Sequence, residues 1–347
     1  MQDSMNRRIV LASRPKGRPT PDNFRIESAP IPAPKDGQLL LETVYLSLDP
    51  YMRGRMNEGK TYADASELGD TMIGATVARV KQSRHADWKE GEFVLAYSGW
   101  QEYALSDGRG LRRLDPHGAP LSTALGVLGM PGFTAYSGLL EIGQPKAGDT
   151  VVVAAASGAV GSAVGQIARI KGARAVGIAG GPEKCAFVKD ELGFDAVVDH
   201  RAPDFADQLR KACPDGIDVY FENVGGQVWD AVRPLLNKFA RVPVCGLVSH
   251  YNAGADGAKE ERAAIDLQDL LFRSLTVRGF IQVDFVEQYE ADFLREAPQW
   301  VKEGKLRYRE DIVDGLENAP DAFIGLLEGK NFGKLSVRVK PEGQQGK

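Results

Sequence analysis

The stretch VVVAAASGAVG, from Val151 to Gly161, joins an apolar run to a turn of small residues. This pattern predicts a strand, a tight turn and then a helix that begins near Ser162. Gly158 would let the backbone approach a bound pyrophosphate, and Gly161 would let the helix pack closely on the strand. The N–H groups and the dipole at the start of the helix would bind the phosphates. Ala155 stands where the first glycine of the usual fingerprint would be, so the motif reads AxxGxxG.

Apolar runs alternate with helical patterns in the region that begins at Thr150. The runs are VVVAA, ARAVGIA, AVVD, DVYFEN and RVPVCG, and helices are expected over residues 162–171, 183–192 and 228–236. Such alternation predicts βα units on a buried parallel sheet, an α/β fold of the doubly wound Rossmann type. Small residues also occur wherever a helix packs tightly on a sheet. The second strand, at 175–179, lies at the βαβ interval and favours dinucleotide binding over packing alone.

The first 125 residues differ from this region, because their apolar segments are short and are separated by turn-forming residues. Strands are expected over residues 38–48, 71–80, 92–96 and 103–105, which predicts a compact, mostly β domain. The change in periodicity places a domain boundary near Gly126. Beyond it, a helix is expected at 286–303, after the segment 275–280, and the chain closes with the segment 322–329 and a strand at 334–340.

Composition bounds the possible functions. The 347 residues are 43% hydrophobic and 26% charged, with a net charge of −4, so two globular domains are expected and no basic surface for nucleic acid is indicated. The apolar run after Arg7 and Arg8 is too short for a signal peptide, and no stretch approaches the roughly 20 apolar residues of a membrane span. We therefore expect a cytoplasmic protein with a small-molecule partner.

The three cysteines, Cys185, Cys213 and Cys245, are widely spaced and form no CxxC pattern. Neither a disulfide framework nor a clustered zinc site is expected. A catalytic zinc would need Cys, His or carboxylate ligands in the β domain, yet the first 184 residues hold no cysteine and only His85 and His117. A hydride enzyme without a Lewis acid requires a substrate that is already electrophilic at carbon, such as a conjugated enone or a quinone.

The end of the second strand bears on the choice of cofactor. Enzymes that use NAD place an acidic residue there to bind the ribose, whereas this chain has Gly180. Lys184 follows near the position of a 2′-phosphate, and Arg201 follows the third strand. These residues favour NADPH over NADH, although Lys184 on its own would also suit a solvated helix face.

Six motifs together resemble one known family, and the match covers nearly the whole chain. They are SLDPYMRGRM (47–56), GMPGFTAYSGL (129–139), AASGAVGSAVGQIA (155–168), FENVGG (221–226), VCGLVSHYN (244–252) and KNFGK (330–334). The family is that of the zinc-free medium-chain reductases, which includes leukotriene dehydrogenase/prostaglandin reductases, plant alkenal double-bond reductases and bacterial curcumin reductases. The curcumin-reductase-like branch is the most similar.

The resemblance implies a fold and a set of cofactor contacts. The fold has a GroES-like substrate and catalytic domain at 1–125, to which 311–347 returns, and a Rossmann NADP-binding domain at 126–310. A homodimer is also implied. Cofactor contacts carried over by matching motifs are Met130, Thr134, Gly158, Ala159, Val160, Gly161, Gly180, Lys184, His200, Asn223, Cys245, Gly246, Tyr251, Phe280, Ile281, Gln282 and Asn331. His200 departs from the pattern, since many relatives have tyrosine there, and His250 receives no family role.

The implied reaction is reduction of the C=C bond of α,β-unsaturated ketones or aldehydes. Hydride addition at the β carbon leaves an enolate, and a donor aimed at its oxygen would stabilise the developing charge. Tyr251 is the candidate for that donor, and Tyr51 either lines the substrate side or serves as a packed aromatic anchor at a strand end. Three alternatives stay open: a quinone reductase on the same scaffold, a dehydrogenase of hydroxylated lipids, and a non-catalytic NADPH-binding protein.

Overall fold

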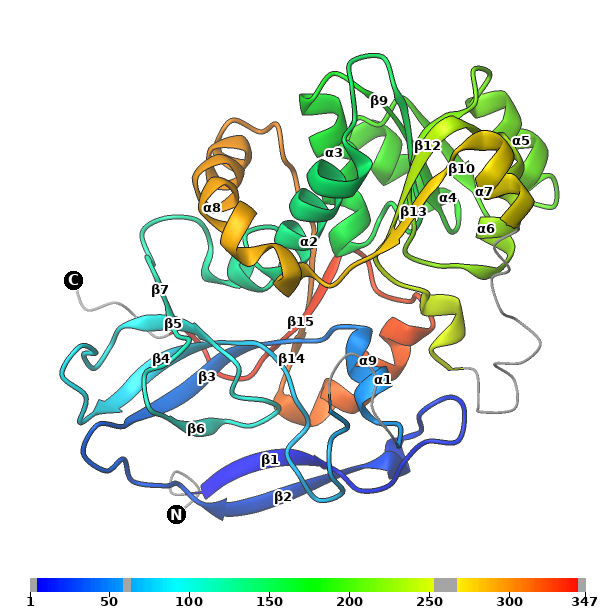
Figure 1. The fold of residues 1–347 in the computed structure, drawn as a ribbon. Coiled ribbons are helices and arrows are strands. Elements are labelled where there is room, and N and C mark those ends of the chain that lie inside the picture. Colours follow the sequence, from blue (N-terminus) through cyan, green and yellow to red (C-terminus); the bar gives the residue numbers. More distant parts are fainter. Residues whose placement is uncertain (1–4, 59–63, 253–266, 343–347) are drawn as a thin grey trace. The chain divides into compact units, whose positions relative to one another are not determined.

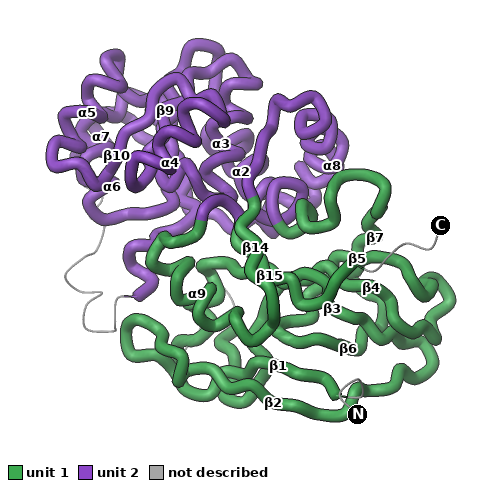
Figure 2. The backbone as a smooth tube through the Cα atoms, turned by 180° about the vertical axis from the view of Figure 1, so that it is seen from behind, with its two compact units in different colours: residues 1–125, 310–331, 335–347 green, residues 126–309, 332–334 purple. Residues whose placement is uncertain are grey.

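The computed structural model describes residues 5–58, 64–252 and 267–342. The chain folds into two compact units, drawn in separate colours in Figure 2. Unit 1 contains residues 1–125, 310–331 and 335–347, and unit 2 contains residues 126–309 and 332–334. The last three residues of unit 2 are therefore contributed by a segment that returns near the C-terminus.

Unit 2 is built on a six-stranded sheet whose order is β10-β9-β8-β11-β12-β13, and each of its neighbouring pairs is parallel. The strands are β8 (Thr150–Val153), β9 (Arg174–Ala179), β10 (Ala196–Asp199), β11 (Ile217–Phe221), β12 (Leu236–Val244) and β13 (Thr276–Gly279). The order runs outward in opposite directions from β8 and β11. That point is where open α/β sheets bind their ligands.

Helices surround this sheet (Figure 1). They are α2 (Met130–Gly138), α3 (Ala159–Ile170), α4 (Pro182–Ala186), α5 (Phe205–Ala212), α6 (Gly226–Val232), α7 (Leu267–Arg273) and α8 (Val286–Lys302). Phe205 from α5 and Trp229 from α6 pack in one buried cluster with Val152 and Val176 of the sheet. The predicted Rossmann-type parallel sheet is confirmed.

Unit 1 is mostly β, as predicted. Its seven-stranded sheet has the order β14-β15-β3-β4-β5-β7, with β6 paired to β3, and a separate hairpin joins β1 to β2. The strands are β1 (Met5–Leu11), β2 (Phe24–Pro30), β3 (Leu39–Ser47), β4 (Thr76–Ser83), β5 (Phe93–Ala96), β6 (Tyr103–Ser106), β7 (Arg112–Leu114), β14 (Glu310–Asp314) and β15 (Lys334–Arg338). Its described residues also form the α-helices α1 (Tyr51–Arg55) and α9 (Ala319–Leu327).

The core of unit 1 combines residues that are distant in the sequence. The rings of Phe24 and Trp100 are stacked with centroids 5.6 Å apart, and Phe323 of α9 meets both edge-on. Apolar side chains of β3 and β15 extend the same cluster. The C-terminal elements thus supply part of the core of the N-terminal domain.

Several expected elements differ from the observed ones. The helix expected from Ser162 begins at Ala159, because Gly158 has the extended φ/ψ of an N-cap (−82°, 171°). The helix expected over 183–192 is α4 followed by a π-helical turn at Phe187–Glu191. The strand expected at 71–80 is β4, which begins only at Thr76. The β1–β2 hairpin and α2 were not predicted.

Candidate functional site

The turn after β8 has the geometry that phosphate binding requires. Ala155 adopts a left-handed conformation (φ 52°), although it carries a side chain at the position where the fingerprint usually has glycine. A Cβ added to Gly161 would lie 2.3 Å from the Ala155 carbonyl oxygen, so only glycine lets α3 pack this closely on the turn. Gly158 caps the 12-residue helix α3. The free N–H groups at its start, on Ala159, Val160 and Gly161, fit a pyrophosphate.

A basic corner lies at the end of β9. A Cβ added to Gly180 would lie 2.7 Å from His200 Nε2 and 3.0 Å from Arg201 Nε, so both side chains cover the glycine. Lys184 is on α4, the helix that follows. Partial desolvation lowers the pKa of His200, and the positive charges of Arg201 and Lys184 lower it further. A concentration of cations where an acid would bind an NAD ribose fits a 2′-phosphate.

Asp199, the last residue of β10, organises this corner. Its Oδ1 accepts hydrogen bonds from the backbone N–H groups of Gly181 (3.0 Å) and Arg201 (2.9 Å). Although desolvation opposes the effect, these N–H groups hold the pKa of Asp199 below its usual range. The carboxylate therefore joins the Gly181 turn to the loop that carries His200 and Arg201. An acid at the end of a predicted strand was a usable signal, and the sequence interpretation missed it.

The segment after β11 joins the strand ends at the switch point. Asn223 Nδ2 donates to the Ala154 carbonyl oxygen at 2.9 Å, which connects this segment to the turn after β8. Glu222 is 2% exposed, and its Oε1 accepts the backbone N–H groups of Val224 (2.6 Å) and Gly225 (2.9 Å). Burial raises the pKa of Glu222, and those N–H groups only partly offset it. Glu222 is thus a buried acid that shapes the turn beside Asn223, a role that the sequence interpretation did not assign.

Tyr251 lies on a loop that is bonded to this same turn. Val248 N donates to the Asn223 carbonyl oxygen and Ser249 N to that of Val224, both at 3.1 Å. Cys245 and Gly246 donate their N–H groups to the Glu222 carbonyl oxygen at 2.9 Å and 3.2 Å. The predicted residues Asn223, Cys245, Gly246 and Tyr251 are therefore held together at the ends of β11 and β12. Burial raises the pKa of the Cys245 thiol to about 12, so this thiol is protonated at neutral pH.

The predicted contacts on α2 and after β13 are placed by packing. Thr134 Oγ1 donates to the Met130 carbonyl oxygen at 2.7 Å, so its hydroxyl is already engaged within α2. The Phe280 ring is buried, and a Cβ added to Gly138 of α2 would lie 2.2 Å from its Cζ. The Phe280 N–H is also engaged, because it donates to the Val244 carbonyl oxygen at 3.3 Å. Ile281 and Gln282 follow directly and lead into a 3-10 turn over Gln282–Phe285.

Tyr51 and Asn331 belong to unit 1, whereas the other predicted site residues belong to unit 2. Tyr51 is the first residue of α1, which corrects the expectation of a strand end. It is partly buried against the core cluster of unit 1, as a packed aromatic anchor would be. Asn331 directly precedes Phe332, the first residue of the segment that returns to unit 2.

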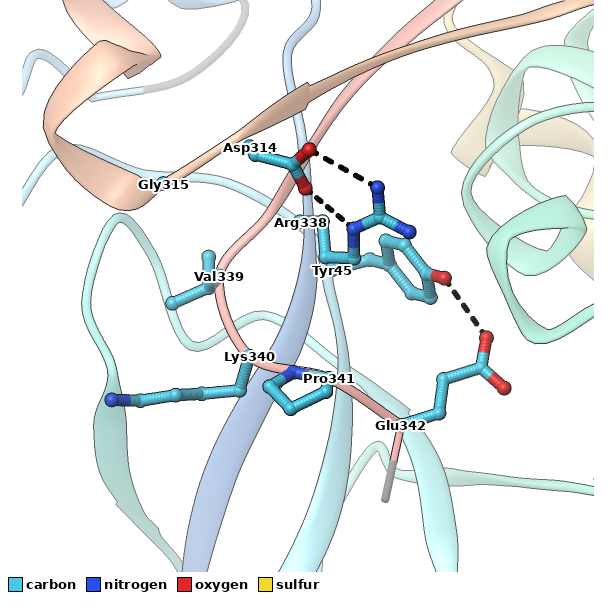
Figure 3. A pocket seen from close by; sticks show the side chains of 8 residues that line it. All are labelled: Tyr45, Asp314, Gly315, Arg338, Val339, Lys340, Pro341 and Glu342. Atoms are coloured by element: carbon cyan, nitrogen blue, oxygen red, sulfur yellow. Dashed lines mark hydrogen bonds and ion pairs between the residues drawn. The ribbon is translucent and has the colours of Figure 1, made fainter. Parts of the chain in front are cut away.

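A cavity of about 650 Å³ lies in unit 1, and none of the predicted site residues lines it (Figure 3). Arg338 forms an ion pair with Asp314 (2.5 Å) at its wall, and the Tyr45 hydroxyl donates to Glu342 at 2.9 Å. Burial and the bond to Glu342 raise the pKa of Tyr45 to about 12. The charged side chains drawn there are engaged with one another or with neighbours, and none is a predicted site residue.

The described residues hold neither a cluster of metal ligands nor a membrane-spanning helix. Within residues 5–58, 64–252 and 267–342, no group of three or more His, Cys, Asp or Glu side chains is arranged to hold a metal ion. No helix in that part of the chain has the length and apolarity needed to cross a membrane.

Comparisons with known proteins agree with this geometry. A family model described as the N-terminal domain of oxidoreductase matches residues 7–114, and one described as zinc-binding dehydrogenase matches residues 159–297. The NADPH-dependent curcumin reductase of Escherichia coli is 56% identical, covering 97% of this chain and 98% of its own length. The chain belongs to the curcumin-reductase-like branch of the medium-chain dehydrogenase/reductase family. The second family is described as zinc-binding, but the described residues of this member form no cluster of metal ligands.

Two further relatives are similar to this chain along nearly its whole length. Prostaglandin reductase 1 of Sus scrofa is 42% identical over 93% of this chain and 96% of its own length. The crystal structure of CurA from Vibrio vulnificus in complex with NADPH matches with a TM-score of 0.91 and 56% identity. That match covers 96% of this chain and 99% of the solved one. Both relatives match along nearly their full length, so the resemblance is not confined to the Rossmann unit.

Proposed function

We propose that this member of the family reduces the C=C bond of α,β-unsaturated ketones and aldehydes with NADPH. The observation that carries the proposal is the meeting of three features on one sheet. They are the phosphate-binding turn at Gly158, the basic corner around Gly180, and the loop that holds Tyr251 over the end of β12. The names of the curcumin and prostaglandin reductases support the same class of reaction.

Bound NADPH would supply a hydride to the β carbon of the substrate. The chain's own residues bind the cofactor and orient the substrate. The N–H groups at the start of α3 would hold the pyrophosphate, Lys184 and His200 would bind the 2′-phosphate, and the Asn223 turn would bind on the ribose side. Tyr251 donates a hydrogen bond to the enolate oxygen, because a donor that is already in place when charge develops lowers the barrier. Its hydroxyl can also deliver the proton that the α carbon requires.

An NADPH-oxidation screen tests this proposal against its alternatives. Purified protein is supplied with a panel of enals, enones and quinones, and separately with NADP⁺ and hydroxylated lipids. We expect turnover of enones and enals to exceed that of quinones, with the saturated ketone or aldehyde recovered as product. Faster quinone turnover would assign a quinone reductase, and alcohol oxidation would assign a dehydrogenase. NADPH binding without turnover of any acceptor would leave a binding protein.

We also propose that the chain forms a homodimer through unit 2. Strand β13 is the edge of its sheet, and no further strand pairs with it in the described part of the chain. Close to it in sequence, α7 exposes Leu267, Leu271 and Phe272, each more than 70% accessible. An open strand edge beside large exposed apolar side chains is a surface that soluble proteins usually cover.

Sedimentation measurements test the dimer. We expect the wild type to sediment as a dimer, and the double variant Leu271→Asp/Phe272→Glu to be a folded monomer. A monomeric wild type would overturn the proposal, as would a double variant that stays dimeric.

A cytoplasmic location is proposed as well. Cys185, Cys213 and Cys245 are all free thiols, which is typical of proteins in a reducing compartment.

A further inference from the structure

The chain returns to unit 2 for only three residues, Phe332 to Lys334, and these lie along the phosphate-binding turn. Gly333 forms a parallel β-bridge with Gly158, the residue that caps α3. Lys334 N donates to the Arg309 carbonyl oxygen at 2.9 Å. Arg309 is the residue at which the chain had left unit 2. The exit and the return of the chain are therefore fastened to each other beside the turn.

The Phe332 side chain is held by two neighbours of different kinds. The guanidinium carbon of Arg309 lies 3.7 Å from the centroid of the Phe332 ring, a close cation–π contact. The Phe187 ring meets Phe332 edge-on, with centroids 4.9 Å apart and an interplanar angle of 79°. Phe187 is buried and directly follows α4, the helix that carries Lys184. The ring is thus fixed by a cation and by a buried aromatic side chain.

The backbone at Gly333 is too closely packed to accept a side chain. Its φ is +80°, and a Cβ added there would lie 2.2 Å from the Arg309 carbonyl oxygen. The main chain at Gly333 is consequently pressed against that of Arg309 on one side and bridged to Gly158 on the other. A small displacement of Phe332 or Arg309 would move the backbone next to the cap of α3.

We propose that Phe332 and Arg309 act as a clamp that fixes Gly333 against Gly158 and so keeps the pyrophosphate-binding turn in its binding geometry. Both are positioning residues that act through Gly158. The proposal rests on the proposed function, since it takes the Gly158 turn as the NADPH phosphate site. A turn that is already ordered loses less conformational entropy on binding, and this favours affinity.

The test compares substitutions that remove the ring or the cation with one that keeps the ring. Phe332→Leu and Arg309→Met abolish the cation–π contact, whereas Phe332→Tyr preserves it. Arg307→Met is the matched control for charge, because Arg307 is exposed and bonds only to backbone carbonyl oxygens of Gly304 and Glu191 through its side chain. Phe239→Leu is the matched control for ring loss, since Phe239 is 62% exposed and has its own cation, Lys238, at 5.2 Å.

The measurements are the NADPH dissociation constant and the melting temperature of the NADPH-free protein. We expect Phe332→Leu and Arg309→Met each to raise the dissociation constant by about threefold to tenfold, the range that a cation–π contact supports. Phe332→Tyr and both controls should stay within about twofold of the wild type. Each change also removes a contact with Phe187. The double variant Phe332→Leu/Arg309→Met should still lose less than the sum of the two single losses, because both changes remove the contact that Phe332 and Arg309 share.

Two outcomes would overturn the clamp. One is a lowered melting temperature with an unchanged NADPH dissociation constant, which is what packing without a role in binding would give. The other is a double variant whose loss is the sum of the two single losses. Failure of the proposed function can be told apart from failure of the clamp. If the wild type does not bind NADPH, the proposed cofactor site is wrong, whatever the variants do.

Discussion

The hydroxyl of Tyr251 lies directly over Gly246: a Cβ added to Gly246 would be 3.0 Å from Tyr251 Oη. Gly246 comes just after the carboxyl end of β12, and its N–H donates to the Glu222 carbonyl oxygen at 3.2 Å. The tyrosine therefore turns back over the end of the strand, where α/β sheets bind their ligands. A bulkier residue at position 246 would displace the hydroxyl.

Tyr251→Phe removes this hydroxyl and keeps the ring. If the hydroxyl stabilises the enolate, kcat for an enone should fall by roughly 100- to 1000-fold, the scale seen when one oxyanion donor is lost. NADPH affinity should change little. Steady-state kinetics with isotopically labelled NADPH, which shows whether hydride transfer limits the rate, make the comparison. Tyr97→Phe is the control, since Tyr97 is 67% exposed in unit 1. An unchanged kcat under hydride-limited conditions would remove Tyr251 from the mechanism.

Lys184→Ala tests the basic corner. A charge-assisted contact to a phosphate contributes about 1.5–3 kcal/mol, so NADPH affinity should fall by roughly 10- to 150-fold. NADH has no 2′-phosphate, and its affinity should be nearly unchanged. Titration of both cofactors into the variant measures the difference, with Lys211→Ala on α5 as the control. Equal losses for NADPH and NADH would contradict the assignment.

NADPH affinity should depend on pH through His200. In the free protein desolvation lowers the pKa of His200, and Arg201 and Lys184 lower it further. A bound 2′-phosphate favours the protonated imidazole, so binding raises this pKa and takes up a proton. Affinity for NADPH should therefore increase as the pH falls from about 8 to about 6. NADH should show no such trend, and His200→Gln should reduce the trend for NADPH. A trend that persists in the His200→Gln variant would assign it to another group.

Glu222 should make the free energy of unfolding fall as the pH rises, whereas a carboxylate in an ion pair makes it fall as the pH drops. Its pKa is raised by burial above the ordinary value of 4.5, so the folded chain holds this proton more tightly than the unfolded chain does. That contribution to stability is complete below 4.5 and is lost as the pH rises through the raised pKa. Glu222→Gln keeps an oxygen for the Val224 and Gly225 N–H groups but cannot ionise. Its free energy of unfolding should fall less than that of the wild type between about pH 5 and about pH 8. Equal declines in denaturant titrations would contradict this.

Exhaustive chelation should leave activity intact. The first 184 residues contain no cysteine, and the described residues hold no cluster of metal ligands. Metal analysis of the purified protein should find no stoichiometric zinc, and turnover after dialysis against a chelator should equal that before it. Loss of activity that added zinc restores would overturn the expectation.

The Rossmann sheet was predictable from the sequence because its signals are local. Runs such as Val151–Val153 are apolar throughout, as strands covered on both faces must be, and Gly158 and Gly161 mark the turn after them. The start of α3 was missed by three residues, since Ala159 and Val160 look equally suited to the turn and to the helix. Helix ends depend on cap geometry, which residue type alone does not determine here.

The features that sequence reasoning missed depend on distant partners. Nothing local in KNFGK indicates that Phe332 meets Arg309 and Phe187, which are 23 and 145 positions away. Glu222 stood inside a quoted motif, but it is buried where β11 lies between β8 and β12, and both partners are distant in the sequence. The β1–β2 hairpin was missed because β2 exposes most of its side chains and so lacks a clear alternation of polar and apolar residues.

The path of the chain also limits how this protein can be divided. It passes from one unit to the other at 125/126, 309/310, 331/332 and 334/335, so neither unit is a single stretch of sequence. No single proteolytic cut can release an intact unit, and a fragment ending at Arg309 would lack Phe332 and Gly333. Exchange of the whole of unit 1 between relatives by recombination would have to carry both ends of the gene.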